Sequence, residues 1–274
     1  MSEQPLPPSV RDRINTTQAH TARIWNYWLG GKDNYEVDQA LGDQIRSLHP
    51  GIGDYAVADR RFLGRVVRHL VQDLGIRQFL DIGTGLPSAD NTHEVAQRLA
   101  PESRIVYVDN DPLVLAHARA LLVGTPQGRT DYLDADLRDV DHILEQAAKT
   151  LDFDQPIGLI LLGVVIFLGE DETAYGTVRK LLDALPAGSH LVLSHTVRKP
   201  DMPDVDEAVA FWNANGTPKL TQRTPEGIAR FFDGLELLEP GVVSCNHWRP
   251  EDPAEAAAPE VAMFGGVARL TGGE

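Results

Sequence analysis

Cysteine is almost absent from this 274-residue sequence, in which Cys245 is the single example. One cysteine excludes an intramolecular disulfide and a cysteine zinc cluster. No group of His, Asp and Glu has the spacing of metal ligands, so we expect no metal. No apolar run could span a membrane, and the polar, proline-rich residues 1–8 are unlike a signal peptide. The sequence therefore predicts a soluble cytoplasmic protein with no membrane partner.

Positive charge is also scarce. The chain has 25 Lys and Arg against 40 Asp and Glu, which gives a formal net charge of −15. A surface that binds nucleic acid or anionic lipid needs clustered basic residues, so both partners are disfavoured and a small-molecule partner is expected. With 42% hydrophobic residues, the chain has enough apolar side chains for one large α/β domain or two smaller ones.

The most informative segment is residues 79–87, Phe-Leu-Asp-Ile-Gly-Thr-Gly-Leu-Pro. An apolar strand leads directly into a turn that contains Gly83, Thr84 and Gly85. A strand that ends in a glycine turn before a helix brings the backbone close to a nucleotide-like ligand, and glycine places no Cβ in the way. These three residues are therefore expected to contact a cofactor.

Two cofactor classes share this architecture. A dinucleotide site has a third glycine where this chain has Ser88, and usually an apolar residue at the position of Asp81. S-adenosylmethionine carries an ammonium group, which an acid at Asp81 would suit directly or by fixing the loop. The alternative is that Asp81 only caps local backbone amides.

Acids follow the next two predicted strands as well. Residues 104–109 end in Asp109, with Asn110 beside it, and the strand after it leads to Asp136 and Leu137. A carboxylate at the second strand's end can accept both ribose hydroxyls of an adenosine. Asp136 could accept from the adenine amino group, with Leu137 against the ring. A single acid in such a place is more often a helix cap, but three in succession favour a ligand site.

The sequence predicts two parts. Residues 1–54 form an arm and a helical cap, and residues 55–274 form the main domain. Residues 1–18 are expected to form a loose arm. Residues 21–35 hold two tryptophans and two tyrosines, including Tyr27. They could form a lid over a flat ligand or an amphipathic helix fixed to the core by its aromatics. On the helix predicted over residues 55–74, Arg60 could reach a carboxylate or lie in solvent.

The second half continues the strand–helix alternation. Residues 158–168 are almost wholly apolar, which is typical of a buried central strand, and Gly163 falls where that strand meets the ligand edge. His195 follows the strand at residues 190–194, so it is a candidate proton acceptor, or else a loop hydrogen-bonder. No residue is clearly catalytic, and the candidates are His195 and Tyr27. A helical insertion is expected around residues 199–220, and a closing strand pair at residues 235–244 and 261–270.

This order of elements resembles the class I S-adenosylmethionine-dependent methyltransferases. Residues 22–35, 81–87 and 91–94 together resemble one bacterial family of proposed methyltransferases, long known as a domain of unknown function. The resemblance implies a Rossmann-like, doubly wound, seven-stranded sheet, mostly parallel with the last strand antiparallel. It also implies S-adenosylmethionine in a crevice formed by Asp81, Gly83, Gly85, Asp109 and Asp136. One departure is Ile166, where relatives carry a histidine.

Three functions follow from these observations. The first is methyl transfer from S-adenosylmethionine to an oxygen, nitrogen or carbon of an unidentified small molecule. The second is a regulatory protein that binds S-adenosylmethionine without transfer, which Ile166 and the lack of a clear acid–base pair motivate. The third is an NAD-dependent oxidoreductase, against which Asp81 and Ser88 argue. The oligomeric state stays open, with a homodimer as one option.

Overall fold

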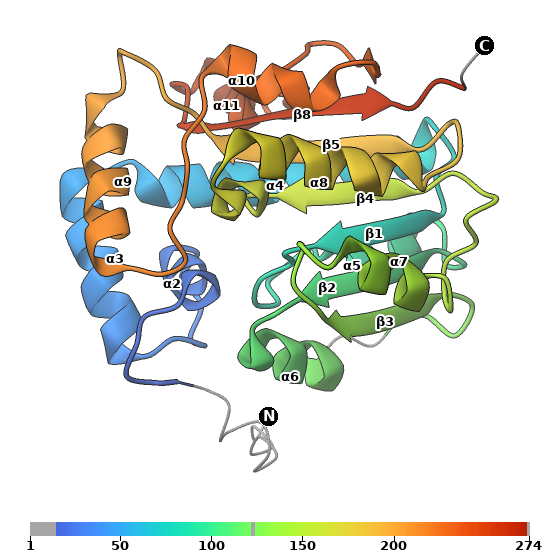
Figure 1. Cartoon of the computed structure of the whole chain (residues 1–274), viewed down its shortest axis with the longest axis horizontal. Helices are drawn as coiled ribbons and strands as arrows, with labels where there is room; N and C mark the ends of the chain where they lie inside the picture. The colour runs from blue at the N-terminus through green and yellow to red at the C-terminus, as the bar shows by residue number, and fades with distance from the viewer. Residues whose placement is uncertain (1–14, 122–123, 273–274) are drawn as a thin grey trace.

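The computed structural model describes residues 15–121 and 124–272. An eight-stranded sheet runs through the molecule in the order β3-β2-β1-β4-β5-β8-β6, with β7 beside β8 (Figure 1). Strands β1 to β5 are parallel, and β8 is antiparallel to β5. The strands are β1 (Gln78–Ile82), β2 (Arg104–Asp109), β3 (Arg129–Asp134), β4 (Gly158–Leu162), β5 (His190–Thr196), β6 (Glu236–Leu237), β7 (Val243–Ser244) and β8 (Met263–Arg269).

The closing strands explain why the sheet has eight strands rather than the seven expected. Residues 235–244, predicted as one strand, form two separate two-residue strands that both pair with β8. Between them the chain turns at Pro240 and Gly241, where φ is +90° and the Gly241 amide donates to the Leu238 carbonyl. Proline has no N–H for a strand ladder, so the edge strand is interrupted there. The mostly parallel, Rossmann-like α/β architecture is confirmed.

Helices cover both faces of the sheet. Helices α4 and α5 pack together on one face, and α7 and α8 pack together on the other. The α-helices are α2 (Thr21–Trp28), α3 (Glu36–Leu48), α4 (Ile52–Gln72), α5 (Thr92–Leu99), α6 (Pro112–Leu121), α7 (Val140–Ala147), α8 (Asp171–Asp183), α9 (Pro203–Asn215), α10 (Pro225–Ala229) and α11 (Pro253–Ala257). Three short 3₁₀ helices are η1 (Val165–Leu168), η2 (Arg230–Phe232) and η3 (Cys245–His247).

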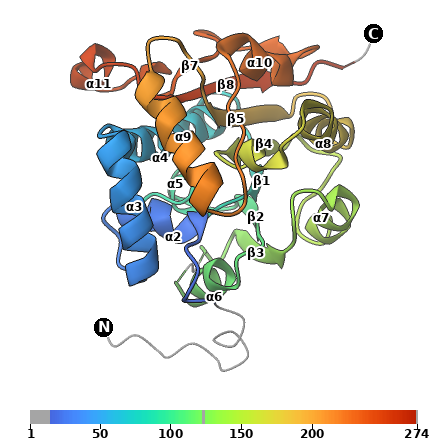
Figure 2. The same cartoon turned by 60° about the vertical axis from the view of Figure 1, so that its left-hand side comes forward.

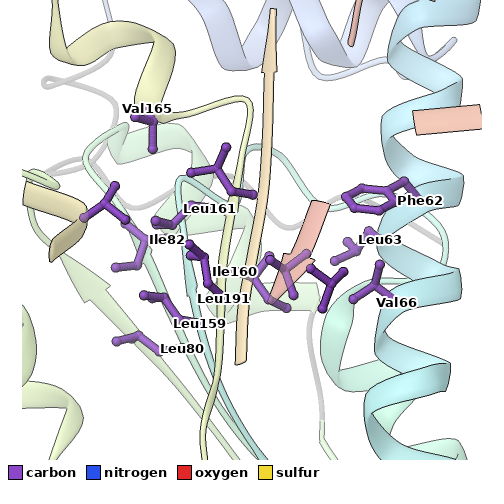
Figure 3. Packing of buried hydrophobic residues seen from close by; sticks show 14 of the residues in the cluster. Phe62, Leu63, Val66, Leu80, Ile82, Leu159, Ile160, Leu161, Val165 and Leu191 are labelled. Carbon is purple, nitrogen blue, oxygen red and sulfur yellow. The ribbon is translucent and has the colours of Figure 1, made fainter. Parts of the chain in front are cut away.

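The core lies between α4 and the central strands. Phe62, Leu63 and Val66, at positions i, i+1 and i+4 of α4, point toward the sheet (Figure 3). Ile160 of β4 and Leu191 of β5 are fully buried with them. A central strand covered on both faces needs apolar side chains on both, which is why β4 carries no alternation of polar and apolar residues.

Helices α2, α3 and α9 gather at the edge of the sheet toward which the parallel strands point (Figures 1 and 2). Helix α9 is the insertion predicted around residues 199–220, and it packs against α3. Ile24 of α2 and Ile45 of α3 belong to the same core cluster as the sheet. Helix α4 begins at Ile52, so the proposed boundary after residue 54 falls inside its first turn.

Residues 250–259, whose composition is acidic and alanine-rich, are not entirely loop. They contain α11, and Glu255 forms ion pairs with Arg61 and Arg65 of α4, each at 2.9 Å. The arm expected over residues 1–18 lies mostly outside the described residues. Within the described part of the chain, no helix is both long and apolar enough to cross a bilayer, and no cluster of three potential metal ligands occurs.

Candidate ligand site

A cavity of about 550 Å³ lies at the carboxyl ends of the parallel strands, a volume within the range of small-molecule sites. Its walls come from the glycine turn, from the loops after β2, β3 and β4, and from α2. The residues predicted to contact a cofactor line this cavity, with one exception, Tyr27. Those that line it are Arg60, Asp81, Gly83, Thr84, Gly85, Asp109, Asn110, Asp136, Leu137 and Gly163.

The two glycines of the turn have different roles. Gly83 has φ of +77°, and a Cβ there would lie 2.4 Å from a Val164 methyl group. Gly85 has φ of +64°, but no atom of residues 15–121 or 124–272 other than its neighbours lies within 4 Å of its Cβ position. Both need the left-handed backbone that glycine tolerates. Gly83 also lets the turn pack against the loop after β4, whereas Gly85 keeps the cavity open.

Asp81 is a buried carboxyl at the floor of the cavity. It accepts a 2.6 Å hydrogen bond from the Thr92 hydroxyl at the start of α5, rather than capping backbone amides. Burial raises its pKa to about 6, although the Thr92 hydrogen bond opposes the shift. The carboxyl is therefore held where a positive ligand group would stabilise its ionised form.

Asp59 is a second buried carboxyl in the same cavity, and the sequence analysis missed it. It comes from α4, and burial raises its pKa to about 6 despite a hydrogen bond with Ser194. Neither Asp59 nor Asp81 forms an ion pair with any described residue. The signal was present in the sequence, because Asp59 occupies the first place in the apolar stripe that continues at Phe62, Leu63 and Val66.

Asp109 fixes the glycine turn to the end of β2. One of its carboxylate oxygens accepts from the Gly85 amide and the other from the Asp111 amide, each at 2.9 Å. Burial raises the pKa of Asp109, and these two hydrogen bonds oppose the rise. Each carboxylate oxygen has two lone pairs, so each could accept one more donor from a ligand.

Asp136 is held by residues on either side of it. Arg138 forms an ion pair with it at 3.0 Å, and the Asn110 amide donates to it at 3.4 Å. The Arg138 guanidinium also donates to the Phe167 carbonyl in η1 at 2.8 Å. Arg138, which the sequence analysis did not select, thereby links two sides of the cavity. Leu137, which lies between Asp136 and Arg138 in the sequence, is buried.

Arg60 lies half-buried at the rim. One terminal nitrogen donates to the Ala89 carbonyl at 3.2 Å, within the loop that follows the glycine turn. Its Nε atom is buried and has no hydrogen-bond partner among the described residues. The guanidinium therefore has capacity for an anionic ligand group.

Tyr27 does not line this cavity, which corrects its selection as a cofactor-binding residue and catalytic candidate. Its hydroxyl donates to Asp43 at 2.7 Å, and the Arg46 guanidinium lies over its ring at 5.2 Å. Trp25 of the same helix lines the cavity instead. Helix α2 thus turns Trp25, and not Tyr27, toward the cavity.

His195 is also not placed to act as a base. It is fully buried and lines neither this cavity nor the smaller one described next. Its Nδ1 donates to the Thr196 carbonyl at 2.9 Å, and its Nε2 accepts from Arg223 at 2.7 Å. Burial lowers its pKa to about 3. His195 is thus a neutral hydrogen-bonding residue of the interior.

A second cavity of about 60 Å³ adjoins the first, and both share Thr21, Trp25 and Phe167 as wall residues. Helices α2, α3, α4 and α9 supply most of its lining, which is largely apolar. Ile166 of η1 is buried in this wall. The chain therefore places an apolar side chain at this point of the wall.

The fold and the larger cavity define an α/β protein with a cavity of small-molecule size at successive strand ends. The chain belongs to the S-adenosyl methyltransferase family, whose model matches residues 8–271. This finding confirms the predicted class of enzyme and its methyl donor, S-adenosylmethionine, and it removes support from the NAD-dependent alternative. No curated protein matches the chain.

Solved structures agree with this assignment. A DUF574 family protein from Streptomyces avermitilis is 43% identical, with a TM-score of 0.90 over 94% of this chain and 100% of that one. A Thermobifida fusca protein described as a candidate methyltransferase is 36% identical, with a TM-score of 0.87 over 97% and 98%. Magnesium protoporphyrin IX methyltransferase from Synechocystis, solved with S-adenosylhomocysteine, shares the fold at 15% identity and a TM-score of 0.54, over 90% and 93%.

Proposed function

We propose that this protein transfers the methyl group of S-adenosylmethionine to a small-molecule acceptor, and that the larger cavity holds the donor. The observation that carries the proposal is the pair of buried carboxyls, Asp59 and Asp81, beside the glycine turn. Their raised pKa values mean that a cation would stabilise both ionised forms. The methyl donor carries such a cation at its amino-acid end.

The other wall residues fit the remaining parts of the donor. Arg60 has a buried nitrogen with no partner in the described part of the chain, and this nitrogen suits the donor carboxylate. Asp109 has lone pairs left for the ribose hydroxyls, and Asp136 with Leu137 suits the adenine. Gly83, Thr84, Gly85 and Gly163 allow the backbone to approach the ligand closely.

The donor supplies a methyl group already activated by its sulfonium. The protein therefore has to place the acceptor in line with that methyl and exclude water. The shared wall residue Trp25 lies where it would cover the junction between the two cavities. A proton acceptor is needed only when the acceptor atom arrives protonated.

Isothermal titration calorimetry with S-adenosylmethionine and S-adenosylhomocysteine tests the donor site directly. We expect one bound molecule of either per chain, and weaker binding in Asp81→Asn and Asp59→Asn. Asp73→Asn is the matched control, because Asp73 is an exposed acid next to the end of α4. Absence of binding by the pure wild-type protein would refute the proposal.

A methyl-donor turnover screen over a metabolite library then separates an enzyme from a regulatory binding protein. Transfer of label to any defined acceptor establishes catalysis. Donor binding without transfer to any library member would favour the regulatory function.

A further inference from the structure

His49 and Asp204 form a contact between two helices that are far apart in the sequence. His49 caps the C-terminal end of α3, and Asp204 lies in the first turn of α9. The His49 Nδ1 and an Asp204 carboxylate oxygen are 2.5 Å apart. The hydrogen bond with His49 is the main cause that lowers the pKa of Asp204, and the amide groups at the helix start add to it.

This contact determines where the imidazole can accept a proton. An ionised carboxylate only accepts hydrogen bonds, so Nδ1 carries the proton. In the neutral ring Nε2 then presents a lone pair. His49 Nε2 is buried and has no hydrogen-bond partner among the described residues. A buried acceptor without a partner carries a free-energy cost that a donor on a ligand would remove.

The imidazole lines the smaller cavity, where few other polar groups are present. Tyr55 and Thr196 are hydrogen-bonded to each other there at 2.7 Å. Among the described residues that line this cavity, His49 is the only one with an acidic or basic side chain. Three of the four tryptophans of the chain also line it. They are Trp25, Trp28 and Trp212.

The lining favours a flat, apolar ligand. Aromatic side chains offer large faces on which a ring can pack. The cavity of about 60 Å³ is smaller than the roughly 150 Å³ of an engineered cavity that holds benzene. A ring can therefore enter only if a wall gives way, and Trp25 and Trp28 stand on α2, at the edge of the fold rather than in the sheet.

We propose that the smaller cavity binds the acceptor, a small aromatic molecule with a hydroxyl group, and that His49 Nε2 accepts the proton of that hydroxyl. Asp204 is a positioning residue that fixes the imidazole tautomer. The assignment rests on the proposed methyltransferase function. It also gives the smaller cavity a base in spite of the apolar side chain of Ile166.

The transfer balances in atoms and charge. The acceptor oxygen forms a bond to the methyl carbon while the carbon–sulfur bond breaks, and that electron pair stays on the sulfur. The hydroxyl proton moves to His49 Nε2. The positive charge that leaves the sulfonium thus reappears on the imidazolium, next to the carboxylate of Asp204. Products are a methyl ether and a neutral thioether.

Fluorine NMR with 4-fluorophenol as the probe tests the cavity without a known acceptor. Titrations use the full chain with and without S-adenosylhomocysteine, and 4-fluoroanisole, which lacks the hydroxyl, is the control ligand. We expect the wild type to bind the phenol about fivefold more tightly than the anisole, the effect of one hydrogen bond. His49→Leu should bind both ligands equally, and intrinsic tryptophan fluorescence should change on binding in both proteins.

The role of Asp204 is tested by a spectroscopic signature. In protein with ¹⁵N-labelled histidine, the His49 signal, identified by its absence in His49→Leu, should show the Nδ1-protonated tautomer. Asp204→Ala should give a mixture of tautomers. His69→Leu and Asp73→Asn are matched controls, because they alter a similar pair, at 2.6 Å, that lines neither cavity. Neither control should change the phenol preference.

Each outcome bears on a distinct statement. If S-adenosylhomocysteine does not bind, the proposed function fails and the catalytic role of His49 fails with it. If it binds but the wild type shows no preference for the phenol, only the acceptor assignment is overturned. A preference that survives in His49→Leu, with folding shown by an unchanged circular dichroism spectrum, also overturns it.

Discussion

The two cavities are built in different ways. The larger one lies on the ends of rigid parallel strands and is rich in carboxylates, whereas the smaller one lies between helices and is largely apolar. Strand ends hold polar groups in fixed positions, which suits a ligand whose charges and hydroxyls never change. Helices α2, α3 and α9 pack at the edge of the fold, which suits an acceptor that must enter and leave (Figure 2). The difference separates a polar site built on strand ends from an apolar one built between helices within one fold.

The largest effect is expected at the glycine turn, which belongs only to the larger cavity. Gly83→Ala would force a methyl group against Val164 and impose a strained φ, so we expect a loss of about 3 kcal/mol in unfolding free energy. Binding of S-adenosylhomocysteine should fall below detection by calorimetry. Gly85→Ala is the control. It imposes a strained φ without a clash, so we expect a loss of only about 1 kcal/mol in unfolding free energy. Equal destabilisation by both would contradict the packing argument.

The buried carboxyls should show a conflict between stability and binding. The pKa of Asp81 is about 6 in the folded protein and about 4 when unfolded, so the folded state loses stability as pH rises from about 4 through 6. Asp81→Asn should therefore stabilise the ligand-free protein by about 1–3 kcal/mol at pH 8, with no gain below pH 4. The same substitution should weaken donor binding about 10- to 100-fold. Urea unfolding at several pH values and calorimetry measure the two effects.

Asp59→Asn should behave in the same way, since its pKa is raised by the same cause. Asp73→Asn should change neither quantity, because that carboxyl is exposed. A stability gain without any loss of donor affinity would mean that these acids do not contact the donor.

His195→Gln should separate structural from chemical roles. It breaks a buried pair of hydrogen bonds with Arg223 and the Thr196 carbonyl, so we expect a loss of about 2 kcal/mol in stability. Donor affinity should stay within twofold of the wild type, because His195 lines neither cavity. A fall in donor affinity at unchanged stability would show that His195 takes part in donor binding.

The smallest effect is expected at Tyr27. Tyr27→Phe removes one exposed hydrogen bond to Asp43, so stability should change by less than about 0.5 kcal/mol. Donor affinity should not change. Trp25→Leu, two residues away on the same helix, should weaken donor binding several-fold because Trp25 lines both cavities. If Tyr27→Phe weakened donor binding more than Trp25→Leu, then α2 would present Tyr27 rather than Trp25 to the donor.

The sequence predicts the strand-end half of the molecule well because that half is local. An apolar strand, a glycine turn and an acid are adjacent in the chain, so Asp81, Asp109 and Asp136 could be selected without a fold. Asp59 was missed because its only sign of burial is its place in the apolar stripe of α4, and a lone acid in a helix is usually exposed to solvent. His49 and Asp204 were missed for another reason. They are 155 residues apart, and only the packing of α3 on α9 brings them together.

Helix rotation limited the prediction for the N-terminal segment. Four aromatic residues within residues 21–35 indicated an aromatic cover, but the choice among them depends on which way α2 faces. That orientation is set by Asp38, which accepts from the His20 and Tyr35 amides and pairs with Arg23 at 2.9 Å. A buried ion pair of this kind carries no periodic signal in the sequence.

Helix α4 serves both cavities at once. Tyr55 lines the smaller cavity, and Asp59, one turn further on, lines the larger. Four residues of α-helix span about 6 Å along the axis, so this one helix fixes the distance between the two cavities. A residue inserted between these positions would turn the rest of α4 by about 100° and carry Phe62 and Leu63 off the sheet together with Asp59. The spacing of the two cavities is therefore tied to the packing of the core, and neither cavity can be shifted alone.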